Sequence, residues 1–246
     1  MPFPMSPGQY ISGRFRQVET LRTSDRKIRI FFSGNQDREA YDHPVFRDFF
    51  QKLSRVAVID TLVKGLSPEE IAIVEKKAQW QMLDNGYQNK LVLNRWAWSP
   101  SKSENLESRV SDEQWLETLA KSYFFLAPPG IRMPLCFNII EAMSVGSIPI
   151  TQYPEFFDPP LEHLKNALVF KSKDDLLRKI RDALSMDEKE INDMQAGVAN
   201  YYDKFLQIDR LPHMINQFEQ SNTALFINAE EVSYQDYLKE RQRGSR

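Results

Sequence analysis

The segment from Tyr123 to Tyr153 most limits the folds open to this chain, because it joins two apolar runs through a turn and one apolar helix. Tyr123 to Ala127 predicts a buried strand that a Pro-Pro-Gly turn closes. A helix is expected over Leu135 to Val145, and Ile148 to Ile150 predicts a second buried strand. A strand, a helix and a strand in this order favour a right-handed crossover between parallel strands.

Glu141 is the one charged residue between Arg132 and Glu155, and it lies on the apolar helix. Burying a carboxylate there without a partner would cost several kcal/mol, on the order of the cost of an isolated buried ion. A wet helix edge or a distant arginine would give Glu141 a structural role. A ligand would give it a binding role, because the carboxyl ends of parallel strands and the helix N-termini beside them bind phosphate. The segment therefore predicts a nucleotide site, with Glu141 accepting hydrogen bonds from sugar hydroxyls.

The composition sets broad limits on class and location. The 246 residues are 41% hydrophobic, which is ample for a folded core, and 32 basic against 34 acidic residues give a net charge of −2. That balance gives no reason to expect a nucleic-acid or membrane surface as partner. One cysteine, Cys136, cannot form an internal disulfide, and no apolar run approaches the roughly twenty residues of a membrane span. The expected location is the cytoplasm.

The order of elements predicts an α/β fold, with a mostly parallel Rossmann-like sheet and helices on both faces. Residues 1–26 are expected to form an extended arm or linker, residues 27–185 the Rossmann-like domain, and residues 186–246 a helical extension with a charged tail. The expected strands are Ile28 to Phe32, Val56 to Ile59, Leu91 to Leu93, Tyr123 to Leu126, Ile148 to Ile150 and Leu168 to Phe170.

The helices between these strands follow from apolar stripes and start signals. Ser67-Pro68-Glu69-Glu70 has the N-cap and first-turn residues of a helix that runs towards Asp84. Other helices are expected at Pro44 to Leu53, from Ser111 onwards, in a short stretch to Lys165, at Ser172 to Leu184, at Asp187 to Leu206 and from Pro212.

From about Lys27 to Ser185 the chain resembles the carboxy-terminal, donor-binding half of GT-B glycosyltransferases, most closely the exostosin-like group. The residues that carry the resemblance are Ile30 to Asn35, Phe124 to Gly130, Asn138 to Met143 and Gly146 to Ile150. The resemblance implies that Glu141 binds the ribose hydroxyls of a nucleotide-sugar donor. It also implies that Gly130 and the helix start after it receive the diphosphate, and that Gly146 and Pro149 lead into the next strand.

The helix start differs from the exostosin-like pattern, which often has Ser and Arg where this chain has Cys136 and Asn138. Asn138 thus stands at the donor-binding position without a positive charge. A GT-B enzyme also has two Rossmann-like domains, and residues 1–26 are too few to form the acceptor domain. A second domain or protein partner is therefore expected to complete such an enzyme, and no catalytic base is assigned.

Further candidates lie where predicted strands end. Gly34 closes the first strand, and Arg38 and Arg95 can reach the carboxyl edge of the sheet to neutralise phosphate; the alternative is that both arginines are solvated surface residues. Trp96 and Trp98 can stack on a base or belong to the core. The three histidines have no metal-like spacing, and neither a dinucleotide fingerprint nor a P-loop is present.

Two functions of different class follow. The first is a metal-independent glycosyltransferase that moves a sugar from a nucleotide-diphosphate donor to a saccharide or related acceptor, with the donor as substrate and no further cofactor. The second is a module that binds nucleotide sugars, or interacts with a partner, without turnover. Catalytic transfer from a donor separates the two.

Overall fold

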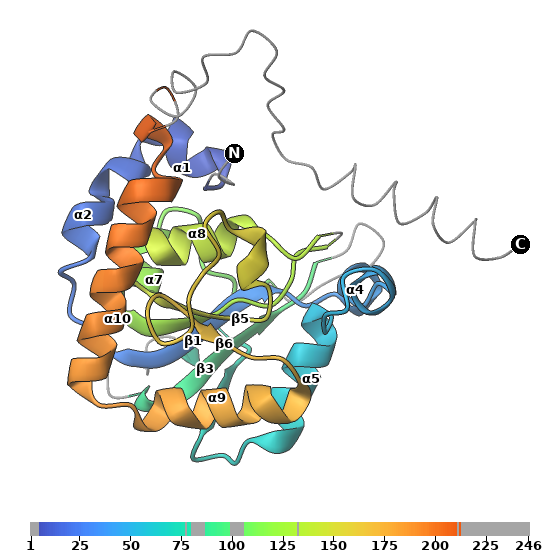
Figure 1. Cartoon of the computed structure of the whole chain (residues 1–246). Helices are drawn as coiled ribbons and strands as arrows, with labels where there is room; N and C mark the ends of the chain where they lie inside the picture. Colours follow the sequence, from blue (N-terminus) through green and yellow to red (C-terminus); the bar gives the residue numbers. More distant parts are fainter. Residues whose placement is uncertain are drawn as a thin grey trace, which may run out of the picture.

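The six strands form one sheet in which every pair of neighbours is parallel, in the order β2-β3-β1-β4-β5-β6 (Figure 1). The structure, a computed structural model, describes residues 5–76, 78–79, 87–98, 106–131, 133–210 and 212. The strands are β1 (Ile28–Asn35), β2 (Ile71–Val74), β3 (Tyr87–Trp96), β4 (Ser122–Leu126), β5 (Ile148–Thr151) and β6 (Leu168–Val169). The expected α/β fold with a parallel sheet is confirmed.

Helices cover both faces of the sheet. They are α1 (Pro7–Ile11), α2 (Val18–Leu21), α3 (Arg38–Tyr41), α4 (Val45–Asp48), α5 (Arg55–Gly65), α7 (Trp115–Ala120), α8 (Phe137–Ser144), α9 (Lys173–Ser185) and α10 (Glu188–Tyr201), which continues as a π-helix over Tyr202–Leu206. Short 3-10 turns span Arg14–Gln17, Pro154–Phe156 and Ile208–Arg210. Helices α5 and α9 pack together on one face, and α2, α7, α8 and α10 cover the other (Figure 1).

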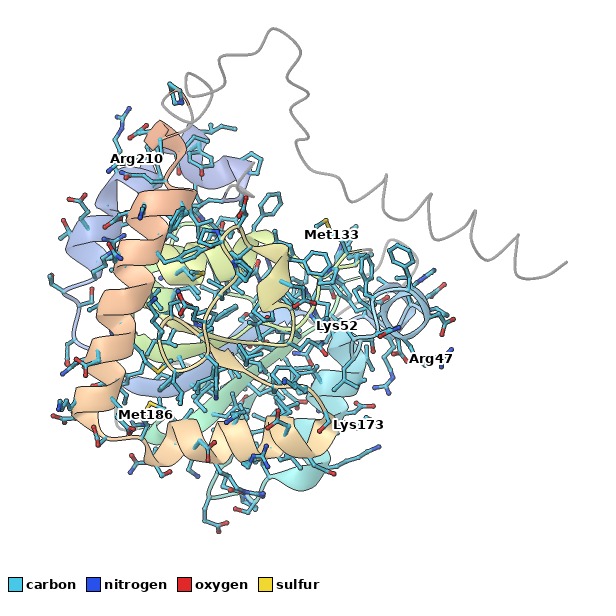
Figure 2. All side chains as sticks on the ribbon, in the orientation of Figure 1. Arg47, Lys52, Met133, Lys173, Met186 and Arg210 are labelled. Atoms are coloured by element: carbon cyan, nitrogen blue, oxygen red, sulfur yellow. The ribbon has the colours of Figure 1, made fainter. Side chains whose placement is uncertain are left out.

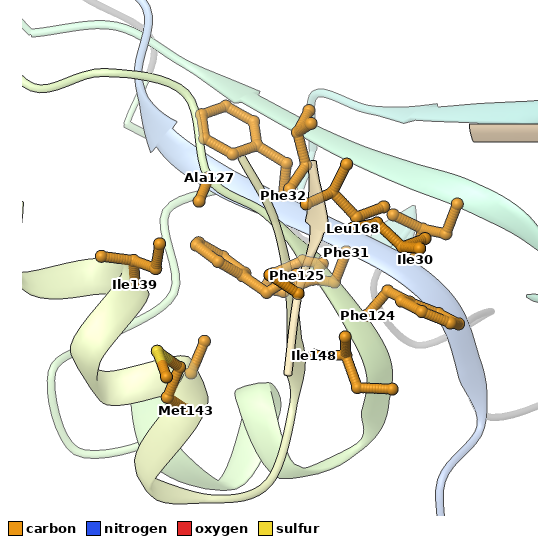
Figure 3. Close-up of a cluster of buried hydrophobic side chains, with 14 of the residues drawn as sticks. Ile30, Phe31, Phe32, Phe124, Phe125, Ala127, Ile139, Met143, Ile148 and Leu168 are labelled. Atoms are coloured by element: carbon orange, nitrogen blue, oxygen red, sulfur yellow. The ribbon is translucent and has the colours of Figure 1, made fainter. Parts of the chain in front are cut away.

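The core lies between the sheet and these two layers of helices. A parallel sheet that is covered on both faces needs apolar side chains on both sides of each strand. Ile30, Phe31 and Phe32 of β1 are accordingly fully buried, and Phe124 and Phe125 of β4 lie beside them (Figure 3). Each buried phenylalanine contributes about 1.5–3 kcal/mol, so this pair of strands contributes strongly to the stability of the core.

The predicted strand at Val56 to Ile59 is wrong, because these residues lie in the first part of helix α5. Its run of β-branched residues favoured a strand. The buried side chains nevertheless repeat at helical spacing, since Val56, Ile59 and Leu62 all face the core. Ser54 starts the helix as its N-cap, accepting a hydrogen bond from the amide of Ala57 at 3.1 Å.

The helix expected from Ser67 towards Asp84 is wrong over residues 67–76, although residues 78 and 79 are helical. The capping contact forms, since the Ser67 amide donates to the Glu70 carboxylate at 2.9 Å, but only a turn follows. Residues Ile71–Val74 instead form edge strand β2, which pairs with β3. β-branched side chains beside a ready neighbouring strand outweigh the local helix signal here. Residues 77 and 80–86 lie outside the described part.

Residues 5–26 form short helices packed on the domain, and the expected extended arm is wrong for them. Met5 is fully buried and Val18 nearly so. Arg22 donates two hydrogen bonds to the Asp203 carboxylate, at 2.7 and 2.8 Å. The amino-terminal segment is thus held against the helices on the α8 side of the sheet.

Several other helices are shorter than expected. The helix predicted over Pro44 to Leu53 is a single turn, α4, and the stretch before Lys165 contains the 3-10 turn Pro154–Phe156 but no longer helix. The helix at Ser172 to Leu184 is confirmed as α9. Figure 2 marks its ends with Lys173 and Met186. Apart from Pro212 itself, the helix expected there and the charged tail lie outside the described residues.

Ser54→Ala should lower the free energy of unfolding by about 1–2 kcal/mol, because it removes the N-cap of α5. Ser54 Oγ also donates to the Asp42 carboxylate at 2.5 Å. Urea unfolding measures the change. The matched control is Ser172→Ala, which removes the N-cap of α9 and should cost about 1 kcal/mol. A Ser54 variant as stable as the wild type, beside a destabilised Ser172 variant, would contradict the capped helix at 55–65.

Candidate functional site

The chain leaves the adjacent strands β1 and β4 towards opposite faces of the sheet. β1 is followed by α5 on one face and β4 by α8 on the other. At such a switch point the loops separate and leave a crevice beyond the carboxyl ends of the strands, which is where open α/β sheets bind ligands. A pocket of about 400 Å³ lies at this place.

Four of the residues expected to bind a donor line this pocket: Glu141, Gly130, Asn138 and Gly34. They come from three elements, the end of β1, the turn after β4 and the first two turns of α8. The side-chain amide of Asn138 lies 3.4 Å from the carbonyl oxygen of Ser33, so it joins the start of α8 to the end of β1. The residues meet because β1 and β4 are neighbouring parallel strands, so their carboxyl ends lie side by side.

Arg38 and Arg95 line a different pocket, of about 290 Å³. Arg38 donates two hydrogen bonds to the Asp60 carboxylate, at 3.0 and 2.6 Å, and this contact lowers the pKa of Asp60. Arg95 Nη1 lies 3.6 Å from a carboxylate oxygen of Glu75. Both guanidinium groups therefore face carboxylates of the protein, and neither lines the pocket that contains Glu141.

Trp96 lines both pockets, and its indole N–H donates to Ser33 Oγ at 3.1 Å. The guanidinium of Arg109, another pocket residue, lies 5.6 Å from the Trp96 ring centroid. Trp98 is 51% exposed and lines neither pocket. Of the two tryptophans considered for base stacking, Trp96 is thus the one placed at the pocket.

Glu141 is only 2% exposed, and both of its carboxylate oxygens accept hydrogen bonds from neutral groups of the protein. The amide of Ser6 donates to Oε1 at 3.0 Å, and the indole N–H of Trp115 donates to Oε2 at 2.6 Å. Neither expected structural partner is present, since the side chain is not at a wet edge and no arginine of the described chain pairs with it. Each carboxylate oxygen keeps a further lone pair, so Glu141 can still accept from a ligand.

Burial has the largest effect on Glu141 and raises the pKa of its carboxyl group. The hydrogen bonds from Trp115 and Ser6 act in the opposite direction and lower the pKa, while the charge of Asp112 raises it further. The net result is a carboxyl group whose pKa lies above its ordinary value.

Arg55 and Arg109 both line this pocket, and Arg55 is the one whose side chain is almost completely buried. Nε donates to the carbonyl oxygen of Pro129 and Nη1 to that of Asn35, both at 2.9 Å. The guanidinium also stacks on Tyr41, 3.9 Å from the ring centroid. Within the described residues no carboxylate forms an ion pair with Arg55, so its charge is compensated by dipoles and a ring alone.

Sequence reasoning missed Arg55 because its segment was assigned to a strand. The available signal was its position directly after Ser54, at the start of an apolar stripe with helical spacing. Gly34 makes room for this side chain, since a Cβ at residue 34 would lie 3.2 Å from Nη1 of Arg55 and 3.0 Å from the Phe32 ring. Residue 34 is therefore restricted to glycine by the space that the side chains of Arg55 and Phe32 occupy.

The start of α8 faces the same pocket. Its N-cap residue, Cys136, forms no capping hydrogen bond of ordinary geometry. Burial raises the pKa of the Cys136 thiol, although the nearby Arg55 charge and the amides of Asn138 and Ile139 lower it. A neutral thiol is a weak acceptor, so it occupies the amides of Asn138 and Ile139 only weakly, and the positive end of the α8 dipole can still attract an anion.

Gly130 shapes the turn between β4 and α8. A Cβ at this position would lie 2.8 Å from the carbonyl oxygen of Met133, so a larger residue would push the turn open. The amide of Gly130 donates to the carbonyl oxygen of Pro134 at 3.1 Å. The turn is thus compact and keeps the start of α8 close to the end of β1.

A scan against protein-family models matches none of them, and a search of curated proteins also gives no match. Among the described residues, no group of three or more His, Cys, Asp or Glu side chains is arranged to hold a metal ion. No helix in the same part of the chain is both long and apolar enough to cross a membrane.

The free energy of unfolding should depend on pH through Glu141. Because the folded pKa lies above the unfolded value of 4.5, the folded state holds more protons, and stability falls as the pH rises from 4.5 through the raised pKa. Urea unfolding of the wild type and of Glu141→Gln over about pH 4 to 8 isolates this effect, since other carboxyl groups titrate alike in both proteins. The wild type should lose stability relative to the variant as the pH rises. A difference between the two proteins that stays constant with pH would show that Glu141 has an ordinary pKa.

Proposed function

We propose that this chain binds a nucleotide-diphosphate sugar and acts as the donor-binding half of a metal-independent GT-B glycosyltransferase, which moves the sugar to a saccharide or related acceptor. The observation that supports this most is the presence of two opposite buried charges in one pocket. Arg55 supplies a cation without a carboxylate partner among the described residues, and Glu141 supplies a carboxylate that only neutral groups bind. A ligand with an anionic group and several hydroxyl groups complements both.

The distance from the start of α8 to Glu141 suits a nucleoside diphosphate. The start of α8, at Phe137, and Glu141 are four residues apart, which is about 6 Å along a helix. A diphosphate at the helix start and Arg55 would leave the attached ribose near Glu141. The ribose hydroxyls would then donate to the remaining lone pairs of the carboxylate or replace the Ser6 amide there.

The same arrangement suits the chemistry of sugar transfer. When the bond between the sugar and the diphosphate breaks, negative charge grows on the leaving phosphate oxygens. Amides at the start of α8, its dipole and the Arg55 guanidinium all stabilise charge at that position. Preorganised donors of this kind contribute on the order of 3 kcal/mol each to a transition state, so the group can leave without a bound metal.

A binding module without turnover is the second candidate, and one observation favours it. The described residues form a single sheet, whereas a GT-B enzyme has two Rossmann-like domains around its reaction site. If the chain is part of a transferase, a second domain or a protein partner supplies the acceptor-binding site and the catalytic base.

Arg55→Met should weaken the binding of uridine, guanosine or adenosine diphosphate, whichever binds best, by about 10- to 100-fold, because a charge-assisted contact is lost. Arg55→Lys should also weaken binding, since an ammonium cannot hold both carbonyls and stack on Tyr41. Calorimetry on folded protein measures the dissociation constants.

The matched control for Arg55 is Arg38→Met in the second pocket, which should change the affinity by no more than about twofold, as expected for an exposed ion-paired residue. A larger loss for Arg38 than for Arg55 would move the diphosphate to the second pocket and refute the proposed position.

Turnover separates the two candidate functions. The protein should release nucleoside diphosphate from the UDP-, GDP- or ADP-sugar that it binds when saccharide acceptors are present, and the release should fall with Arg55→Met. A coupled assay for free nucleoside diphosphate measures this rate. Tight binding of the donor with no release over hours, with or without acceptor, would favour the non-catalytic module.

A further inference from the structure

Gln9 lies in α1 and lines the pocket beside Glu141, with a side chain that is only 2% exposed. Its amide oxygen, Oε1, is buried and has no hydrogen-bond partner. The same short segment places the Ser6 amide on the Glu141 carboxylate. The amino-terminal segment therefore forms the wall of the pocket nearest to Glu141, and it brings one unsatisfied acceptor there.

An unpaired buried acceptor is unusual, because leaving such a group without a donor costs stability and nearly all buried polar groups have partners. In the described residues three buried side-chain atoms lack a partner: Gln9 Oε1, Arg29 Nε and Asn94 Oδ1. Of these three residues, Gln9 alone lines either of the two pockets. Gln9 is therefore the one of the three residues that a ligand in a pocket could contact.

The position of Gln9 also fits the polarity of the pocket. Arg55, Asn138 and the first amides of α8 are hydrogen-bond donors at the end where the strands finish. Glu141 and Gln9 Oε1 add acceptors to the same lining. A bound group that carries O–H or N–H donors would therefore find acceptors in both side chains.

We propose that Gln9 recognises the nucleoside part of the ligand by accepting a hydrogen bond from a ribose hydroxyl or a base N–H. This inference rests on the proposed nucleotide-sugar function and makes the amino-terminal segment part of the binding site. Gln9 and Glu141 then select the nucleoside, while Arg55 and α8 hold the diphosphate.

The test compares the wild type, Gln9→Met and Gln17→Met by calorimetry with uridine, guanosine and adenosine diphosphates and with pyrophosphate. Methionine keeps the length of the side chain and removes the amide, and Gln17 is an exposed glutamine of the same segment. Gln9→Met should weaken the best-bound nucleoside diphosphate about three- to tenfold, the effect of one lost hydrogen bond. Its pyrophosphate affinity and its melting temperature should not fall, and Gln17→Met should match the wild type throughout.

Three other results would overturn the inference, and they separate a failure of the proposed function from a failure of the role of Gln9. If the wild type binds none of the nucleoside diphosphates, the proposed function fails and the role of Gln9 fails with it. If the wild type binds them and Gln9→Met binds equally well, only the role of Gln9 fails. Equal losses for nucleoside diphosphate and pyrophosphate would show that Gln9 acts on the fold alone.

The 2′-deoxy analogue of the best-bound nucleotide identifies the donor group. If the wild type and Gln9→Met bind this analogue equally, the ribose 2′-hydroxyl is the group that Gln9 recognises. If the difference persists, the donor is the 3′-hydroxyl or the base. Either result supports recognition of the nucleoside by Gln9.

Discussion

The pocket depends on one side chain, Arg55, because its guanidinium ties together the two chain segments that separate at the switch point. It donates to the Asn35 carbonyl at the end of β1 and to the Pro129 carbonyl in the turn after β4. Those strands lead to helices on opposite faces of the sheet, and Arg55 links them at the base of the crevice together with the contact between Asn138 and Ser33. The same guanidinium group gives the pocket a buried positive charge. Arg55 therefore contributes both to the shape of the pocket and to its charge.

Two opposite buried charges share the pocket, and in the described residues they do not pair with each other. Arg55 is compensated by carbonyls and the Tyr41 ring, and Glu141 by the Ser6 amide and the Trp115 indole. A direct ion pair would have left a neutral pocket with little to attract a polar ligand. Kept apart and bound only by neutral groups, the two charges favour a ligand that is anionic at one end and rich in hydroxyls at the other.

The sequence was informative where apolar runs are bounded by Pro and Gly. Strands β1, β4 and β5 and helix α8 follow from such runs, and Glu141 was noticed because it is the only charge in the last of them. The 55–76 region was misassigned because β-branched residues occur both in α5 and in β2, and local propensity does not separate the two. Arg55 and Gln9 reach the pocket from segments far from Glu141 in the chain, and only tertiary structure brings them together.

The proposed function places a nucleoside diphosphate between Arg55 and the start of α8, with its ribose at Glu141. A crystal structure of the protein with the best-bound nucleoside diphosphate tests this most directly. We expect density for the diphosphate within hydrogen-bond distance of the Arg55 guanidinium and the first amides of α8, and ribose hydroxyls on the Glu141 carboxylate. Density for the diphosphate at Arg38 and Arg95 in the second pocket, with the pocket at Glu141 empty, would contradict it.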